Sequence, residues 1–416
     1  MFVNWDVAVV GGGAAGYFGA IACAEANPAA RVVIFERGRN PLAKVRISGG
    51  GRCNVTHACF DPAELVRHYP RGGTALLGPF TRFQPRDTVA WFAGHGVTLK
   101  TERDGRMFPD TDSSETIVAC LTRAAQAAGV TVTPGMAIRQ ISRQAEPAGG
   151  GFELGRADGA PMRAKRVLLA TGSAASGWDW ARGLGHSIVP PAPSLFTFEM
   201  TDSIIDGLAG VAVADARVSL AGASKVPEQR GPVLITHRGL SGPAVLKLSA
   251  WGARQLHDSG YRSALTVCWL PEWREDALIE RLSALKHDSS AQRVWTHSPF
   301  APIPNRLWAR LCSAAEILEE QRWAKLPRAN MLKLAAQVLR SCFEVSGKGA
   351  FKEEFVTAGG VALAEVNFKT MESRICPGLY FAGEVLDIDA ETGGFNFQAA
   401  WTTGWHAGRA MAESER

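Results

Sequence analysis

The sequence predicts an α/β fold in which a sheet domain is built from both ends of the chain and a segment of different character is inserted between them. Three observations predict it. The first 36 residues follow a strand–helix–strand pattern, the residues after about 196 alternate apolar with polar side chains, and residues 378–383 return to the strand-and-glycine pattern of the start. Strands separated by helices are typical of parallel sheets, whereas alternation is typical of antiparallel sheets.

The N-terminal elements have clear boundaries. Asp6–Val10 is a short apolar run with β-branched residues, as expected for a buried parallel strand. Residues 14–26 are rich in alanine and contain no proline, which favours a helix. Arg31–Glu36 is a second apolar strand, and further strands are expected at 130–133 and 166–170.

The inserted segment begins after the prolines at 190–193. From about 196 to 270 the alternating pattern predicts an antiparallel β domain with little helix. From about 272 to 341 the chain is helix-like, with a break at 298–304. We therefore divide the chain into a sheet domain (1–195 with 350–416), an inserted antiparallel β domain (196–275 with 335–349) and a helical insert (276–334).

Composition excludes several classes of protein. Of the 416 residues, 46% are hydrophobic and 20% are charged, as in globular proteins with a sizeable core. Apolar runs are far shorter than the roughly 18 residues of a membrane span, and no basic segment precedes an apolar stretch at the N-terminus. We expect no membrane association, no signal peptide and a cytoplasmic location. The eight cysteines include no C-x-x-C pair, which predicts reduced thiols and argues against a disulfide reductase.

A glycine-rich turn lies between the first strand and the first helix. Gly11, Gly13 and Gly16 fit the spacing G-x-G-x-x-G, with Ala14 and Ala15 before the last glycine. In such a turn the first glycine permits the bend, the second lets backbone approach a pyrophosphate, and the third lets the helix pack on the strand. The helix N-terminus adds free N–H groups for the phosphates. The turn therefore predicts a Rossmann-type dinucleotide site.

An acidic residue supports this prediction. Glu36 ends the second strand, 20 residues beyond Gly16, where a carboxylate accepts hydrogen bonds from ribose hydroxyls. Its charge would repel a ribose 2′-phosphate, which disfavours NADP at this position. FAD and NAD are both compatible with these residues.

Two further glycine clusters favour FAD. The first is the run 48–54, Ser-Gly-Gly-Gly-Arg-Cys-Asn, in which Arg52, with Lys44 before it, is expected to supply positive charge. The second comprises Gly-Glu at 383–384 and Thr-Gly-Gly-Phe-Asn at 392–396, before an alanine-rich helix whose N-terminus would stabilise negative charge on a reduced flavin. A cofactor held at three sequence-distant sites is long, which favours FAD.

These strings give the chain a family resemblance that covers nearly its whole length. It resembles the bacterial flavoproteins described as YhiN-like or BaiN-like, named for a bile-acid reductase, which are related to aminoacetone-oxidase-type flavoproteins. The motifs that carry the resemblance are Asp6–Gly16, Ser48–Asn54, Thr236–Pro243, Phe355–Val361, Gly378–Asp387 and Thr392–Asn396.

The resemblance implies a discontinuous FAD-binding Rossmann-type domain with an inserted β domain and a small helical domain. From the glycine-rich turn and the resemblance together we predict FAD contacts at Gly11, Gly13, Ala14, Ala15, Gly16, Glu36, Arg37, Lys44, Ser48, Gly49, Gly50, Arg52, Cys53, Asn54, Ala137, Thr171, Gly172, Gly383, Glu384, Gly394, Phe395 and Asn396. One departure is Thr171-Gly172-Ser173, where such proteins carry Thr-Gly-Gly, and it affects substrate-facing details there.

The resemblance also implies a reaction. Such proteins reduce C=C bonds conjugated to a carbonyl, in steroids for one branch and in ribosomal RNA uridine for another. The electrons would come ultimately from NAD(P)H as a transient reductant, and the alternative is another protein that reduces the flavin. Flavin chemistry fits, because hydride delivery to an enone creates an enolate that an acid or oxyanion donor stabilises. The alternative is a flavin-binding protein or an oxygen-reactive amine or aminoketone oxidase.

Candidates for the proton donor are few. Cys53 lies in the glycine-rich run, and His237 with Arg238 precedes a turn that would line a pocket. For each, a packing or structural role is the simpler interpretation, so the catalytic residues stay open. Asp387 and Glu391 are candidates to flank the open face of the flavin. We predict no metal site.

The helical region is basic. Between residues 277 and 341 there are ten Lys or Arg and five Asp or Glu, and Trp295, Trp308 and Trp323 lie among them. Cationic side chains with interleaved aromatics are typical of an RNA-binding face. The alternative is an ordinary amphipathic helical lid with tryptophans in its core. The substrate is therefore either a small molecule or RNA, and the sequence does not indicate the oligomeric state.

Overall fold

The chain folds into two compact units. In this computed structural model, residues 4–144, 150–156, 159–222, 226–349 and 356–413 are described. Unit 1 consists of Met1–Pro191 with Val356–Arg416, and unit 2 of Ala192–Phe355. Both inserted segments, the β and the helical one, thus belong to unit 2. Their separation into two domains stays a prediction.

Unit 1 contains a sheet whose central strands run parallel. Its strands are β1 (Asn4–Val10), β2 (Val32–Glu36), β6 (Thr131–Pro134), β7 (Ile138–Arg143), β8 (Phe152–Arg156), β9 (Met162–Leu169), β19 (Val366–Asn367), β20 (Glu372–Ser373) and β21 (Leu379–Phe381). The order is β19-β20-β21-β9-β1-β2-β6, and β8 joins β7 to β9. The pairs β1–β2, β1–β9, β2–β6 and β9–β21 are parallel. The predicted parallel α/β core is confirmed.

Helices and short strands surround this sheet. The helices of unit 1 are α1 (Ala14–Ala26), α2 (Ala43–Gly51), α3 (Pro62–Leu65), α4 (Gly73–Phe80), α5 (Pro85–Gly94), α6 (Ser114–Ala127), α7 (Ala175–Gly183) and α13 (Phe395–Glu413), with 3-10 turns η1 (Val66–His68), η3 (Leu363–Glu365) and η4 (Gly383–Val385). A small sheet joins β3 (Thr56–His57), β5 (Arg106–Pro109) and β4 (Leu99–Thr101), and β10 (Ile188–Ser194) pairs with β18 (Val356–Val361).

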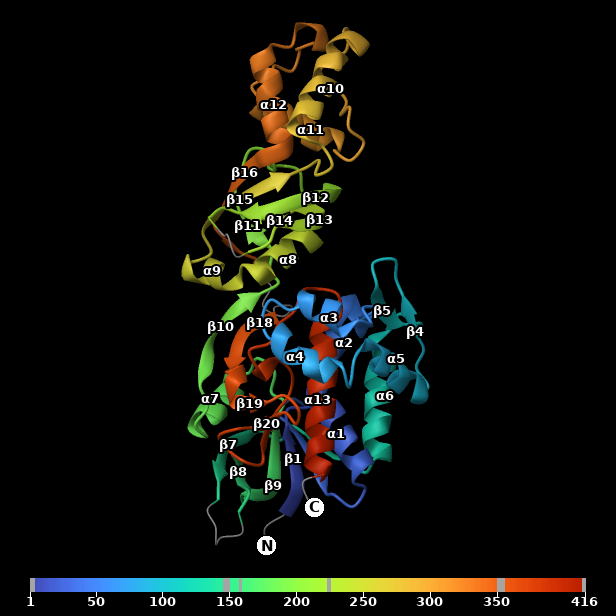
Figure 1. Ribbon diagram of the computed structural model, residues 1–416, viewed down its shortest axis with the longest axis vertical. Helices are drawn as coiled ribbons and strands as arrows, with labels where there is room; N and C mark the ends of the chain where they lie inside the picture. Colours follow the sequence, from blue (N-terminus) through green and yellow to red (C-terminus); the bar gives the residue numbers. More distant parts are fainter. Residues whose placement is uncertain (1–3, 145–149, 157–158, 223–225, 350–355, 414–416) are drawn as a thin grey trace. The chain divides into compact units, whose positions relative to one another are not determined.

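Glycines let α1 and α13 pack with their backbones nearly in contact. Figure 1 shows the blue α1 beside the red α13. A Cβ built at Gly404 would lie 2.7 Å from the carbonyl oxygen of Ala15, and one at Gly408 would lie 2.3 Å from that of Gly19. Because α1 follows the first strand and α13 is the last helix, this contact joins segments from both ends of the sequence.

Unit 2 contains a seven-stranded sheet. Its strands are β11 (Phe198–Glu199), β12 (Ala212–Leu220), β13 (Gln229–Thr236), β14 (Gly239–Ser241), β15 (Ser263–Cys268), β16 (Ser341–Val345) and β17 (Gly347–Lys348), in the order β16-β15-β12-β13-β14-β11-β17. All the described pairs are antiparallel, as predicted. Its helices are α8 (Pro243–Trp251), α9 (Ala253–Asp258), α10 (Glu275–Asp288), α11 (Asn305–Ala314) and α12 (Arg328–Arg340), with the 3-10 turn η2 (Trp323–Lys325).

The prediction of little helix between 196 and 270 is wrong, because α8 and α9 lie there. Gly242 and Pro243 start α8, with proline in the first turn, where its missing N–H removes no helical hydrogen bond. Ala244, Val245 and Leu248 are buried, and α8 packs on β12 and β13. None of the helices in the described part of the chain combines the length and the apolar composition that a bilayer crossing demands.

Candidate functional site

The glycine-rich turn has the geometry that its spacing predicts. Gly11 has φ +116°, and a Cβ there would lie 2.3 Å from the carbonyl oxygen of Ala170 on the neighbouring strand end. A Cβ at Gly16 would lie 2.0 Å from the carbonyl oxygen of Gly11, so helix and strand approach too closely for a side chain. Gly13 precedes α1 without a side-chain cap, and no described atom lies within 4 Å of a Cβ built there. The helix N-terminus is therefore open to a ligand.

Glu36 ends β2 beside this turn. Its carboxylate accepts hydrogen bonds from the N–H groups of Gly12 (2.7 Å) and Gly38 (2.6 Å), which hold both oxygens in place. Each carboxylate oxygen can accept more than one hydrogen bond, so ribose hydroxyls have acceptors left. The N–H of Met136 donates to the Glu36 carbonyl (2.9 Å), which brings the loop containing Ala137 to the end of β2, next to Arg37.

A groove of about 560 Å³ lies near Glu36. Its walls come from α1, α6, β6 and the loop after β2, and include Tyr17, Asn40, Gln126 and Pro134. Burial, and secondly the negative charge of Glu36, raise the pKa of the Tyr17 hydroxyl. The groove combines amide groups with an apolar lining.

The run Ser48–Asn54 adopts a backbone that only glycine enters readily. Gly49, Gly50 and Gly51, the last three residues of α2, have φ of +58°, +67° and +84°. No described atom lies within 4 Å of a Cβ at Gly50 or Gly51. The N–H of Cys53 donates to the Ser48 carbonyl (3.0 Å), which closes the loop on itself. The run thus presents bare backbone at the end of α2.

Asn54 joins this loop to the start of α13. With its amide oriented to suit its neighbours, the oxygen accepts from the N–H of Gly394 (2.9 Å) and the nitrogen donates to the Thr56 carbonyl (3.0 Å). Gly394 has φ +93°, and a Cβ there would lie 2.5 Å from the same carbonyl oxygen. Asn396 bonds both backbone groups of Ala390 at 3.0 Å, which closes the preceding turn. The structure therefore brings two predicted clusters together.

Glu384 connects the third cluster to both of the others. Its Oε2 lies 2.9 Å from Nζ of Lys44, and its Oε1 accepts from the N–H of Thr357 (2.9 Å). A Cβ at Gly172 would lie 3.6 Å from Glu384 Oε2, and one at Gly383 would lie 2.9 Å from Cβ of Ala15. Predicted residues up to 340 positions apart in sequence thus meet beside the N-terminus of α1. Phe355, which opens one of the family strings, lies outside the described residues.

One buried hydroxyl in this region lacks a partner. Among the described residues, Oγ of Thr171 is buried and makes no hydrogen bond. Burying a hydroxyl without a partner costs about 1–3 kcal/mol. A Cβ built at Gly177, in α7, would lie 1.9 Å from this oxygen, so the hydroxyl lies against the backbone of α7.

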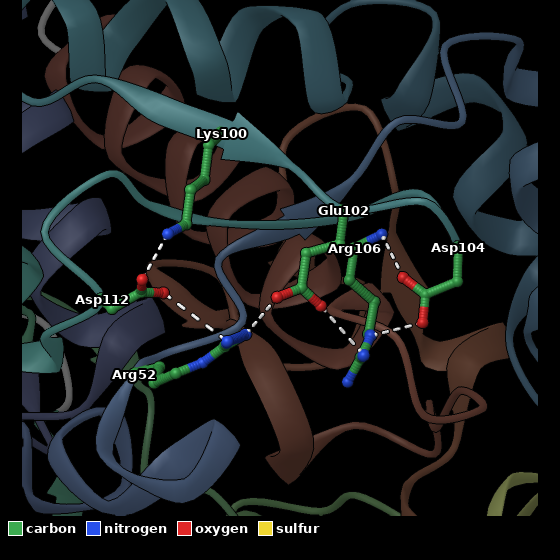
Figure 2. A network of polar contacts seen from close by, with 6 residues as sticks. All are labelled: Arg52, Lys100, Glu102, Asp104, Arg106 and Asp112. Atoms are coloured by element: carbon green, nitrogen blue, oxygen red, sulfur yellow. Dashed lines mark hydrogen bonds and ion pairs between the residues drawn. The ribbon is translucent and has the colours of Figure 1, made fainter.

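Arg52 belongs to a network of charges that the sequence did not predict. Figure 2 shows its guanidinium between Glu102 (2.5 Å) and Asp112 (3.6 Å), and it also stacks on Phe108 at 3.9 Å from the ring centre. The hydrogen bond from Lys100 contributes most to the lowered pKa of Asp112. Both predicted sources of positive charge, Lys44 and Arg52, thus face carboxylates, Glu384 and Glu102, and their contact with FAD stays a prediction.

The candidate proton donors lie in different units. Cys53 is completely buried in unit 1, and burial raises the pKa of its thiol to about 12, so the thiol stays protonated. His237 and Arg238 lie exposed on the turn between β13 and β14 in unit 2, where Arg238 pairs with Glu199 (3.3 Å). The predicted turn is therefore present in unit 2.

Two histidines near the start of α13, His57 and His68, were not predicted from the sequence. Nδ1 of His68 lies 3.2 Å from Oε2 of Glu391, whose side chain is only 7% exposed. The His68 ring stacks on Phe395 at 4.1 Å, and His57 stacks on the same ring at 4.6 Å. Glu391 was singled out from the sequence, whereas His68 lies 323 positions away and no local pattern marks it.

The tryptophans of the basic segment are not exposed on a surface where RNA bases could stack on them. Trp308 and Trp323 are buried in the core of unit 2, and Trp295 is half-buried with its Nε1 donating to the Ile317 carbonyl (2.9 Å). This burial agrees with the alternative of an amphipathic helical segment with tryptophans in its core, and RNA binding by the basic side chains stays a prediction. Arg306 and Arg310 donate to backbone carbonyls of the loop before β12, so part of the positive charge caps that loop.

Metal and disulfide chemistry find no support in the described residues. No group of three or more His, Cys, Asp or Glu side chains within them is placed to hold a metal ion. All eight cysteines are free thiols.

The chain is similar along its whole length to proteins of known activity. It is 30% identical to the 3-dehydro-bile acid delta(4,6)-reductase of Clostridium scindens, over 98% of this chain and 99% of that one. It is 29% identical to the ribosomal RNA dihydrouridine synthase of Escherichia coli, over 97% and 96% of the two chains.

Its fold is also found in a solved structure. The 3-ketosteroid-delta4-(5alpha)-dehydrogenase of Rhodococcus jostii superposes with a TM-score of 0.54 at 15% identity, over 99% of this chain and 97% of that one, which is a likeness of fold alone. The sequence profile of the HI0933-like protein Rossmann domain matches residues 5–410. This match confirms the resemblance drawn from the motifs, and the chain belongs to the HI0933-like Rossmann-domain family.

Proposed function

We propose that the protein is an FAD-dependent reductase that saturates a C=C bond conjugated to a carbonyl, with NAD(P)H as the ultimate electron donor. The observation that carries the proposal is the convergence of Gly11–Gly16, Glu36, the run 48–54 and the turn before α13 in unit 1. A site made from both ends of the chain suits a long dinucleotide better than a short ligand.

The residues present fit FAD. The open N-terminus of α1 at Gly13 suits the diphosphate, and Glu36 suits the ribose. Glu384, held by Lys44 and the Thr357 N–H, suits the ribityl chain. The bare backbone of the run 48–54 and the start of α13 suit a flat ring, and the helix N-terminus there favours negative charge on it. When bound, reduced flavin supplies a hydride.

The reaction class comes from the relatives. One is named a delta(4,6)-reductase of a 3-dehydro-bile acid and others are named ribosomal RNA dihydrouridine synthases, and each name describes the saturation of a C=C bond. We extend that chemistry to this chain. The electron donor is NAD(P)H bound transiently, since no second G-x-G-x-x-G string occurs in the sequence.

The FAD proposal is tested by Gly13→Val. The backbone of Gly13 (φ −92°) accepts any residue, and no described atom lies within 4 Å of a Cβ there, so the variant should fold like the wild type. A side chain in front of the helix N-terminus should weaken FAD binding by about 1–3 kcal/mol, which raises the dissociation constant roughly 5- to 150-fold. Gly94→Val, at an exposed helix end with equally open surroundings, is the control. Equal FAD affinity in both variants would contradict the proposal.

The reaction is tested by following the flavin spectrum without oxygen. Protein reduced with NADH or dithionite should reoxidise when 4-androstene-3,17-dione is added, and the saturated ketone should appear in equal amount. Reduced protein that reoxidises with oxygen alone, and with no enone or uridine, points instead to an oxidase or a flavin carrier.

RNA is a second candidate substrate. The relatives named ribosomal RNA dihydrouridine synthases favour it, as does the excess of basic residues between 277 and 341. Binding through phosphates falls steeply with salt. Retention of a ribosomal RNA fragment that is the same at low and high salt counts against this candidate, as does a lack of dihydrouridine in the recovered RNA.

A further inference from the structure

His68 and Glu391 form a hydrogen-bonded pair at the turn that leads into α13. Nδ1 of His68 lies 3.2 Å from Oε2 of Glu391, and the N–H of Glu391 donates to the His68 carbonyl (2.9 Å). The carboxylate is buried (7% exposed), whereas the imidazole is 31% exposed. A buried acid that bonds one ring nitrogen of a partly exposed histidine leaves the other nitrogen to face a ligand.

Stacking holds the imidazole in one orientation. Its ring lies nearly parallel to that of Phe395, at 4.1 Å and 10°. Phe395 is itself held, because the Tyr69 hydroxyl donates to its carbonyl (2.6 Å) and His57 stacks on it at 4.6 Å. The preceding residue, Gly394, is bound by Asn54. His68 is thereby tied to the backbone turn that the proposed function assigns to the flavin ring.

The hydrogen bond selects a tautomer. Glu391 accepts from Nδ1–H, so neutral His68 carries its lone pair on Nε2 and protonated His68 carries N–H there. Nε2 has no hydrogen-bond partner among the described residues and is not among the buried unpaired atoms. The nearby titratable and charged groups are His57 on β3, the Arg71–Asp389 ion pair, and Glu64 with Arg67 on its own segment.

We propose that His68, oriented by Glu391, is the proton donor of the reduction. This inference rests on the proposed function. As the β-carbon of the enone receives a hydride from the reduced cofactor, the C=C electron pair moves to form an enolate. The Nε2–H of His68 then protonates the α-carbon, which leaves the saturated ketone and a neutral imidazole that recovers a proton from solvent.

The matched control is His95. It is also partly exposed (29%), lies 3.5 Å from a glutamate, Glu25, and stacks on an aromatic ring, that of Trp91, at 3.9 Å. It sits at the end of α5 and none of the proposed FAD contacts involves it. His68→Gln and His95→Gln therefore remove the same chemistry from similar surroundings.

The test follows reoxidation of reduced protein by 4-androstene-3,17-dione. His68→Gln should slow it by about 10²–10⁴-fold, the usual contribution of an acid catalyst, with FAD content and reduction by dithionite unchanged. The wild-type reoxidation rate should fall as the pH rises and His68 loses its proton. This pH dependence should be absent in His68→Gln, unchanged in His95→Gln and shifted to a different pH in Glu391→Gln. Added imidazole should restore activity to His68→Gly, which a purely structural role would not permit.

A second readout needs no turnover. In FAD-free protein, the imidazole ¹⁵N spectrum of His68 should show the Nδ1–H tautomer, and Glu391→Gln should change the tautomer population. A predominant Nε2–H tautomer in the wild type overturns the inference. The inference is also overturned if an enone reoxidises the wild type and reoxidises His68→Gln at the same rate and with the same pH dependence. If wild-type protein is reoxidised by no enone and no uridine, the proposed function falls and the inference falls with it.

Discussion

Replacing Gly408 with alanine should loosen the contact between α1 and α13. Both helices begin at glycine-rich turns that the proposed function assigns to FAD, so their packing sets the distance between those turns. A Cβ at Gly408 would lie 2.3 Å from the carbonyl oxygen of Gly19 and 2.9 Å from the backbone nitrogen of Cys23. These are backbone atoms in the middle of a helix and cannot rotate away.

The expected magnitude follows from two opposing effects. Ordinary van der Waals contact begins near 3.4 Å, so the helices must separate by about 1 Å. Overpacking of this kind costs about 1–3 kcal/mol, and the rigid neighbours place Gly408→Ala in the upper half of that range. The higher helix propensity of alanine offsets about 1 kcal/mol of this destabilisation. We expect a net loss of about 1–2 kcal/mol in the free energy of unfolding of unit 1.

Urea unfolding followed by circular dichroism measures this loss, with Gly94→Ala as the control. Gly94 is an exposed residue at the end of α5 with no described atom within 4 Å of its Cβ position, so the same substitution should raise stability by up to about 1 kcal/mol. The two variants should therefore move in opposite directions. If Gly408→Ala is as stable as Gly94→Ala and retains flavin equally well, the close approach of the helices is refuted.

Three further predictions concern unit 1. Burial is the first cause of the lowered pKa of both His186 and His406, so the unfolded chain binds more protons than the folded chain as the pH falls. The contribution of the two neutral histidines to the free energy of unfolding is therefore fully present above about pH 6.5 and is lost progressively below it. His186→Gln should flatten the pH dependence of the urea midpoint, and an identical slope contradicts this. Arg52→Met and Glu102→Gln, measured as a double-mutant cycle, should give a coupling of no more than about 1 kcal/mol, because both side chains are about one-third exposed. Thr171→Val should leave FAD-free protein at least as stable, since the hydroxyl that it removes lacks a described partner; a clear drop in the urea midpoint would contradict this.

The sequence predicted correctly those turns and strands whose structure depends on residues close together in the chain. The turn at Gly11–Gly16 and the position of Glu36 follow from spacing alone, because backbone clashes at Gly11 and Gly16 exclude any side chain. The antiparallel sheet of unit 2 follows from alternation, which β12 shows from Ala216 to Leu220, after a β-bulge between Val213 and Ala216. The short helices α8 and α9 were missed because a start signal at Gly242-Pro243 is easily taken for a turn within a β region.

Tertiary contacts account for what the sequence could not reveal. The pairing of Arg52 with Glu102 spans 50 positions and that of His68 with Glu391 spans 323, and neither separation leaves a periodic trace. Exposure is also a tertiary property. Trp308 and Trp323 stand among cationic residues in sequence, yet they fill the core of unit 2, because helix faces rather than sequence neighbours decide which side chains meet water.

The central claim is that unit 1 holds FAD, and the nucleotide released from denatured protein tests it most directly. Protein purified in its native state, or reconstituted with FAD and freed of excess, should release FAD in equimolar amount on denaturation, identified by mass and by its visible flavin spectrum. Release of no flavin after reconstitution, or of another nucleotide in its place, would contradict the account.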